Sequence, residues 1–485
     1  MKQIFLASTF FELVCLAAAI DSGVYDTTAA PALLGTGGID TDTDTDSDDD
    51  DDQTAARERI LLVSNNAAVL ELSRPITAAP GADLLLTRFD RVIDLNAAVA
   101  PEHPSTWKPA QNDLPMVEAH LRSTWELGDD TIELILESPQ VNPAISLGRV
   151  FSSATIRVHA DGLMSYGPTR NQIPLTNGQR MSILDYLPLV PGLEPRLLAE
   201  FGIIPQPISP DSFRAVVREL GDATAAELDS ALGDEVRGTS WAFAVGQYLA
   251  ALGLISVAEE TALHVDMIRQ AADRGFTRVV FKPHPAAPPA QLEPLFDAAQ
   301  RLGVDLSVLE IPILAEVIVD RLRPDLIVGG FSTALATAKA IYSVRALAVG
   351  TDMLLDTIAP YQNSNRIPLT IIAEVCDGSA ATSGSDPREL TALVEAVSYC
   401  MAPAVSRDLR DRAESFLSQH LQRTNNSRFR RYFKRKRLTA LRLPGGNADQ
   451  LVPRRLIRQT GVIALLAAKR QQRRIVDRTK ARSED

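Results

Sequence analysis

The sequence predicts an α/β protein in which two doubly wound, mostly parallel sheets face one another. Apolar, β-branched runs alternate with helical stretches, and this alternation is typical of parallel sheets. The 485 residues suffice for two or three folding units of about 150 residues each. With 45% hydrophobic and 23% charged residues, the composition is that of a globular chain. A ligand cleft is expected between the two sheets, at the carboxyl ends of their strands.

The first half begins at the N-terminus. Ile4 to Ala7 predicts a short strand, and a Ser-Thr turn then caps a helix from about Phe10 to Ile20. A signal peptide is the alternative, but Lys2 is its one positive charge and Glu12 interrupts its apolar run. Further strands are expected at 59–67, 90–96, 131–138 and 154–162, with a helix around 116–127.

A mixed segment from about Pro205 to Val236, punctuated by Pro and Asp, predicts a crossing between the halves. A second strand-helix series follows it. Its strands are expected at 240–247, 277–285, 325–330 and 345–350, and its helices at 258–275, 292–303 and 331–342. The predicted organisation is therefore an N-terminal Rossmann-like domain (1–236), a C-terminal Rossmann-like domain (237–420), and a basic tail (421–485).

The net charge of -12 divides unevenly along the chain. Residues 421–485 carry 19 Lys and Arg against 4 Asp and Glu, whereas the preceding 420 residues carry 30 against 57. Within the acidic body, nine of the thirteen residues from Asp40 to Asp52 are Asp, which predicts a disordered insert at 40–53. A calcium loop would need a Gly at its sixth position and a closing Glu, and neither lies in register.

Several function classes are excluded at this stage. Cys15, Cys376 and Cys400 are too few and too scattered for a disulfide framework or a structural zinc site. The six histidines form no HExxH or HxH pattern, which argues against a metal site built from histidines. No apolar stretch reaches the roughly 18 residues of a membrane span, which excludes a multi-pass transporter.

Phe281-Lys282-Pro283-His284-Pro285 is the first candidate for chemistry. The two prolines exclude a helix and hold the imidazole at the end of a strand. Because the usual pKa of His lies near neutrality, His284 could donate to a phosphate or protonate a leaving group. A structural His bonded to a loop carbonyl is the alternative.

Gly329-Gly330-Phe331-Ser332-Thr333 is the second candidate. A strand ends in paired glycines and two hydroxyls open a helix, which is the arrangement of a phosphate cradle. Plain helix capping by Ser332 is the alternative. His284 is expected two strands away in the same sheet, which favours a nucleotide phosphate between the two motifs.

Asp161 and Gly162 form the third candidate, in the N-terminal half. A carboxylate at the end of the strand that carries His159 could serve as a general base across the cleft. Asp-Gly is also a common turn dipeptide, so a plain turn is the alternative.

In chain order, Asp161 with the GLMSYG segment after it, FKPHP, Ile311-Pro312 with Glu316, and a strand ending in GGFST resemble the bacterial polysialyltransferase family and its sialyltransferase relatives. The resemblance runs from Ile4 to about Tyr361. It leaves out the acidic insert and the basic tail.

The resemblance implies a GT-B fold and inverting transfer from CMP-sialic acid to a glycan, with polymerisation left open. It implies that Asp161 supplies the base and that His284 contacts the donor phosphate and acts as acid toward the departing CMP. No metal or other cofactor is required. The nucleotide-binding residues would be Lys282, His284, Pro285, Glu316 (toward the ribose hydroxyls), Gly330, Ser332 and Thr333.

One departure concerns the base. The family motif has two acidic residues before the Gly, whereas this chain has Ala160 and Asp161. Glu137, at the end of the preceding strand, is a substitute by position. A catalytically impaired binding protein is therefore one alternative function. The other is a glycerophosphotransferase that uses CDP-glycerol, because such enzymes also place a His-Pro loop and a hydroxyl cradle around the nucleotide phosphates.

The basic tail predicts a partner different from that of the acidic body. RFRRYFKRKR (428–437) interleaves aromatic and basic residues, and 454–474 flanks an apolar stretch with cations. Both fit a helix on an anionic membrane surface. A solvated tail is the main alternative, and nucleic acid is the least favoured partner. The expected location is the cytoplasm, with peripheral attachment to the inner face of the membrane.

Overall fold

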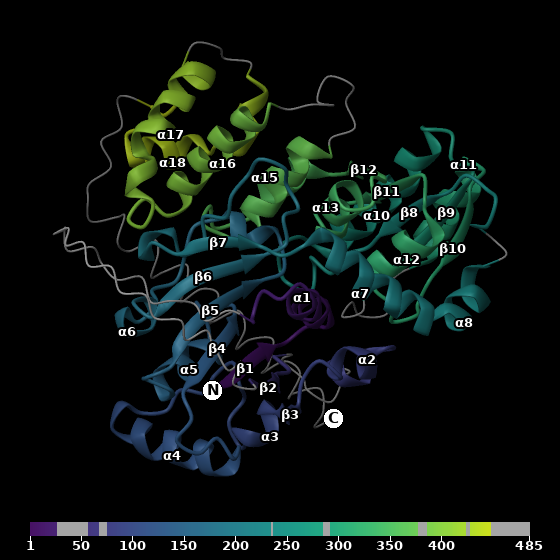
Figure 1. The fold of residues 1–485 in the computed structure, drawn as a ribbon. Coiled ribbons are helices and arrows are strands. Elements are labelled where there is room, and N and C mark those ends of the chain that lie inside the picture. Colours follow the sequence, from purple (N-terminus) through teal and green to yellow (C-terminus); the bar gives the residue numbers. More distant parts are fainter. Residues whose placement is uncertain are drawn as a thin grey trace, which may run out of the picture.

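The computed structural model describes residues 1–26, 57–66, 75–233, 236–284, 292–376, 386–422 and 427–447. Within these ranges the chain forms two sheets surrounded by helices, which confirms the α/β prediction (Figure 1). The predicted acidic insert (40–53), Pro285 and the residues after 447 lie outside the described ranges.

The first sheet has seven strands, and every pairing in it is parallel. In spatial order they are β3 (Arg91–Asp94), β2 (Glu58–Val63), β1 (Lys2–Ala7), β4 (Ile132–Glu137), β5 (Thr155–Ala160), β6 (Met181–Tyr186) and β7 (Ile204–Pro207). Its helices include α1 (Phe10–Asp21), α2 (Ala82–Leu86), α3 (Leu95–Ala98), α4 (Leu114–Thr124), α5 (Ala144–Val150) and α6 (Leu175–Gly178). The strand order reverses between β1 and β4, where parallel sheets place ligand sites.

The expected strand and helix at the N-terminus are confirmed. The apolar run of β1 is buried at the centre of the sheet. The Thr9 hydroxyl caps α1, and the Glu12 side chain accepts in return from the backbone at Thr9. This reciprocal capping satisfies amide donors that would otherwise be unpaired at the start of the helix.

The second sheet is also wholly parallel. In spatial order its strands are β10 (Asp305–Val308), β9 (Arg278–Lys282), β8 (Ala242–Val245), β11 (Leu326–Gly329) and β12 (Arg345–Ala348). Its helices include α10 (Val257–Ala272), α11 (Glu293–Leu302), α12 (Ala315–Leu322) and α13 (Thr333–Ala340). The order reverses between β8 and β11, so this sheet has a second ligand-binding position of the same kind.

The segment predicted as a crossing is more regular than its composition indicated. It begins within the first sheet as the edge strand β7 and continues as α7 (Pro210–Ala223) and α8 (Ala225–Leu228). Helix α7 packs against α1 on one side and α12 on the other, so it lies between the two sheets (Figure 1). Two facing Rossmann-like domains, the GT-B architecture, are thereby confirmed.

After the second sheet the chain forms further helices, and the last of them, from residue 387 on, lie beside the first sheet near β7 (Figure 1). The further helices are α14 (Thr351–Thr357), α15 (Arg366–Val375), α16 (Pro387–Met401), α17 (Arg410–Leu417) and α18 (Arg435–Leu441). Arg196, in the segment between β6 and β7, forms an ion pair with Asp408 at 2.6 Å. The chain therefore crosses from the first domain to the second and then returns.

The membrane prediction for the aromatic residues of 428–437 is wrong. Phe429, Tyr432 and Phe433 are buried in the protein core, each at most 3% exposed. Neighbouring cations are paired within the chain, as in the contact of Arg428 with Glu389 and of Arg431 with Asp352. The aromatic and basic residues of 428–437 therefore pack and pair within the protein.

Among the described residues, no helix combines the length and apolar character needed to cross a bilayer.

Candidate active site

Three carboxyl groups gather at the carboxyl edge of the first sheet. Asp161 directly follows β5, Glu137 ends β4, and Glu12 lies in the first turn of α1. Glu137 pairs in register with His159, two residues before Asp161, so the two carboxyl groups extend from adjacent strands. The Glu12 carboxyl lies within hydrogen-bonding reach of Glu137. The sequence identified Asp161 and noted Glu137 only by position.

Burial and mutual repulsion disfavour full ionisation of this cluster. Burial, together with the charges of Glu137 and Asp161, raises the pKa of Glu12 well above its usual value. Burial and the charge of Glu137 raise the pKa of Asp161 to about 6. A carboxylate with such a pKa is ionised at neutral pH and accepts a proton more readily than a solvated Asp does.

His284 lies in the second domain, two residues after the end of β9, as predicted. Its ring packs against Tyr248, with 4.2 Å between the ring centroids. Burial, and secondarily the charge of Lys282, lowers the pKa of His284 to about 4. The assumption of a pKa near neutrality is therefore wrong for the unliganded protein, whose imidazole is neutral and can donate one N–H.

Lys282 is buried at the end of β9. Its Nζ donates to the Ile311 carbonyl at 2.7 Å, which ties the strand to the loop after β10. Burial lowers the pKa of Lys282 to about 8. The side chain is therefore held against the loop after β10, and its positive charge lies close to the imidazole of His284.

The predicted phosphate cradle lies between β11 and α13. The Ser332 hydroxyl accepts from the Ala334 amide at 3.3 Å, so the capping interpretation holds for Ser332 in the unliganded chain. The Phe331 amide donates to Gln247 Oε1 at 2.9 Å. A Cβ on Gly330 would lie 2.5 Å from that oxygen, so a larger residue there would displace the Gln247 side chain.

The carboxyl edges of the two sheets approach each other at the loop after Asp161 and the start of α13. A Cβ on Gly162 would lie 3.3 Å from Thr333 Oγ1, so the loop after Asp161 and the start of α13 are in contact across the domains. Cys15 on α1 is close enough to both Asp161 and Glu316 for their charges to raise its pKa further, beyond the larger effect of its burial. The structure thus brings the candidate base and the candidate cradle together.

Glu316 lies in the first turn of α12 and is 5% exposed. Its Oε1 accepts from the Thr337 hydroxyl on α13 at 2.9 Å. Burial raises the pKa of Glu316 above its usual value, and the hydrogen bond from Thr337 offsets part of that rise. In the unliganded protein this carboxyl therefore holds α12 to α13 from within.

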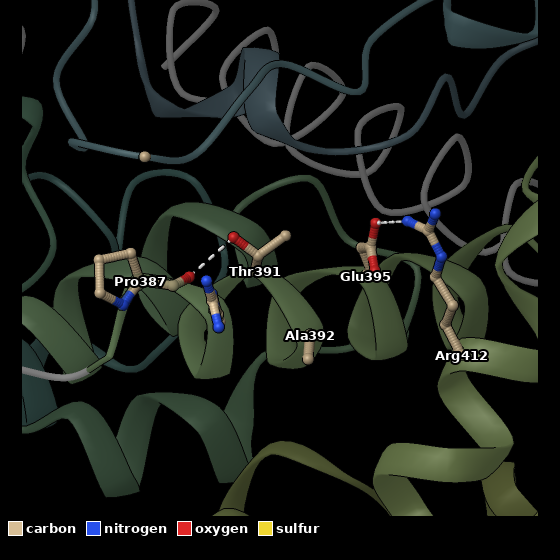
Figure 2. A pocket seen from close by; sticks show the side chains of 7 residues that line it. Pro387, Thr391, Ala392, Glu395 and Arg412 are labelled. Atoms are coloured by element: carbon tan, nitrogen blue, oxygen red, sulfur yellow. Dashed lines mark hydrogen bonds and ion pairs between the residues drawn. The ribbon is translucent and has the colours of Figure 1, made fainter.

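Two further features lie outside this arrangement. Among the described residues, no group of His, Cys, Asp and Glu side chains has the arrangement of metal ligands. A pocket of about 280 Å³ lies along α16, beside Gly192 and Arg412. Figure 2 shows its ion pair between Arg412 and Glu395. None of the site residues described above lines it.

Sequence reasoning missed three residues of the site. Gln247 and Tyr248 follow β8, and the tendency of ligands to bind at strand ends was the signal for both. Glu12 was seen only as a charge in an apolar run, although Thr9 and Glu12 have the spacing of a capping box.

The chain resembles known proteins in both sequence and fold. A family model described as Alpha-2,8-polysialyltransferase (POLYST) matches residues 44–351. No curated protein sequence matches the chain. The chain is similar to the GT-B domain of a Photobacterium damselae sialyltransferase, with 12% identity, a TM-score of 0.36, and coverage of 77% of this chain and 96% of that one. The chain is also similar to Acinetobacter baumannii MurG, with 11% identity, a TM-score of 0.37, and coverage of 86% of this chain and 100% of that one. The family match spans Asp161, His284 and Thr333.

Proposed function

The chain belongs to the alpha-2,8-polysialyltransferase family, and from that premise we propose that it transfers sialic acid from CMP-sialic acid to a glycan acceptor with inversion at the anomeric carbon. It is a glycosyltransferase that takes a nucleotide-sugar donor and a glycan. The observation that carries the proposal is the contact between the loop after Asp161 and the start of α13, because it brings the candidate base close to the candidate phosphate cradle.

In the proposed reaction, Asp161 removes the proton from an acceptor hydroxyl. The acceptor oxygen forms the new bond to the anomeric carbon while the bond from that carbon to the CMP phosphate oxygen breaks. The electron pair stays on the phosphate, whose charge the Ser332 and Thr333 hydroxyls and the start of α13 stabilise.

His284 donates its imidazole N–H to the departing phosphate. Once the anionic donor is bound, its charge favours the protonated imidazole and offsets the effects of burial and Lys282. Glu316 would reach the ribose hydroxyls only after exchanging its hydrogen bond with Thr337.

We expect isothermal titration to show selective binding of CMP over UMP and GMP. The Ser332→Ala/Thr333→Ala variant should bind CMP at least about tenfold more weakly, because hydrogen bonds to a charged group contribute about 1.5–3 kcal/mol each. Ser256→Ala is the matched control, since Ser256 caps α10 in the same domain but lies outside the cradle. Equal weakening in both variants would indicate general loss of helix capping.

The products then separate the alternative reactions. A sialylated glycan formed from CMP-sialic acid supports the proposal, and NMR of the new linkage reports inversion. A growing glycerol-phosphate product would identify a glycerophosphotransferase. CMP binding without transfer would support the alternative of a catalytically impaired binding protein. If none of the three nucleotides binds, both transferase functions are contradicted.

Peripheral membrane attachment is a separate proposal, supported now by residues 454–474 alone, which carry seven Lys and Arg. Each cation near an anionic surface contributes about 1 kcal/mol. We expect the full chain to float with anionic liposomes and not with neutral ones, and truncation after Asn447 to abolish flotation. That truncation keeps the packed helix α18. Equal flotation of both chains would eliminate this role.

A further inference from the structure

The Glu12 carboxyl is held in place by the turn that precedes α1. Its Oε2 accepts from the Ser8 amide at 2.8 Å, the Thr9 amide at 2.9 Å and the Ser8 hydroxyl at 3.2 Å. Two carboxyl groups in hydrogen-bonding contact must share a proton, because two adjacent charges cannot both be maintained. Burial raises the pKa of Glu12 well above its usual value, which favours the protonated form of its carboxyl.

Glu137 is also held in a defined position, at the buried end of β4. It is 5% exposed, and its strand lies between β1 and β5. Ser138, the next residue, has a φ of 45°, in the left-handed region that favours glycine. Backbone strain of this kind is concentrated at functional sites. The strained turn ends the strand immediately after the carboxylate.

We propose that Glu137, held by the Glu12 carboxylic acid, is the positioning carboxylate for Asp161 and supplies from β4 the second acidic group that the chain lacks at Ala160. This inference rests on the proposed function. As Asp161 takes the acceptor proton, the charge of Glu137 stabilises the protonated carboxyl that forms. Asp161 is thereby a stronger base than an isolated Asp.

Other titratable groups near Asp161 do not provide this charge. Cys15 and Glu12 approach from α1, and burial raises the pKa of both, which disfavours their charged forms. His159 lies in the same strand as Asp161, and burial lowers its pKa to about 3, so it is neutral. Glu316 approaches Cys15 from α12. Of these groups, only Glu137 is identified as a charge that shifts the pKa of Asp161.

The test is the pH profile of kcat/KM in Glu137→Gln. In the wild type, activity should fall as the pH drops below about 6, where Asp161 becomes protonated. Removing the neighbouring charge lowers the pKa of Asp161, so the acid limb should move down by about one pH unit. The plateau of kcat should fall about threefold, because the base is weaker. Glu137→Asp restores the charge and should return the limb toward the wild-type position.

Glu133→Gln is the matched control. Glu133 lies in the same strand, is 1% exposed and accepts from Gln3 at 2.8 Å, away from Asp161. Its variant should keep the wild-type acid limb. An unmoved limb in Glu137→Gln, or an equal shift in both variants, would overturn the proposal.

A second measurement does not depend on turnover. With ¹³C-labelled aspartate, the side-chain carboxyl signal of Asp161, assigned by its loss in Asp161→Asn, should titrate near pH 6 and move down by about one unit in Glu137→Gln. A shift in a protein that transfers no sialic acid would refute the proposed function and retain the link between the carboxylates. An unchanged midpoint would refute the link.

Discussion

Replacement of His284 by Ala is expected to lower kcat for sialyl transfer by about 10²–10⁴-fold, the usual contribution of a positioned proton donor. The ring is fixed by its packing against Tyr248 and lies after β9, beside the strand that leads to Gln247. Ala removes the N–H that would reach the leaving phosphate. The loss should appear mainly in kcat, with CMP affinity measured by titration falling far less. His284→Asn keeps an N–H donor and should recover part of the rate.

His264→Ala is the matched control for this prediction. His264 lies on α10 in the same domain, and burial lowers its pKa to about 4 as well. Its ring packs against Phe281, with 5.1 Å between centroids. If the two variants lose activity equally, the His284 effect reflects packing. Wild-type turnover in His284→Ala would remove this residue from the mechanism.

Asp161→Asn should also lower kcat by about 10²–10⁴-fold, because an amide of the same shape cannot take the acceptor proton. CMP binding should remain within a few-fold of the wild type, since the cradle lies on the other domain. A combined measurement of kcat and CMP affinity therefore separates the loss of a base from the loss of the fold.

Asp94→Asn is the corresponding control. Asp94 ends β3 in the same sheet and accepts from the Ala97 amide at 3.2 Å as the cap of α3. Asn caps helices about as well as Asp, so stability and turnover should both be retained. Wild-type kcat in Asp161→Asn would instead assign the base to Glu137.

The alternation of apolar runs was enough to predict most of both sheets. Strands that are buried along most of their length, such as β4 and β9, were predicted because apolar runs and turn residues agree there. β7 was missed because Pro205 and Pro207 interrupt its pattern, and such prolines are tolerated only at a sheet edge, where β7 lies. Helix α7 was missed because Asp and Gly punctuate a sequence whose apolar residues form one buried face.

The site was predictable only as separate strand ends. Asp161, His284 and Ser332 each follow a strand, and the rule for parallel sheets places such residues at one edge. The contact of Gly162 with Thr333 was not predictable, because it depends on how two domains pack through α7. The burial that lowers the pKa of His284 is a property of that packing too.

The return of the chain to the first domain has a mechanical consequence. Two peptide connections join the domains, one through α7 and one through the segment between β12 and α15. Two bodies linked at two points can swing about the line that joins those points but cannot twist freely, as they could on a single linker. Admission of a donor between the contacting loops is therefore expected to be a hinge rotation about one axis. The packing of α15 against Leu163–Tyr166 of the first domain would define one end of that axis.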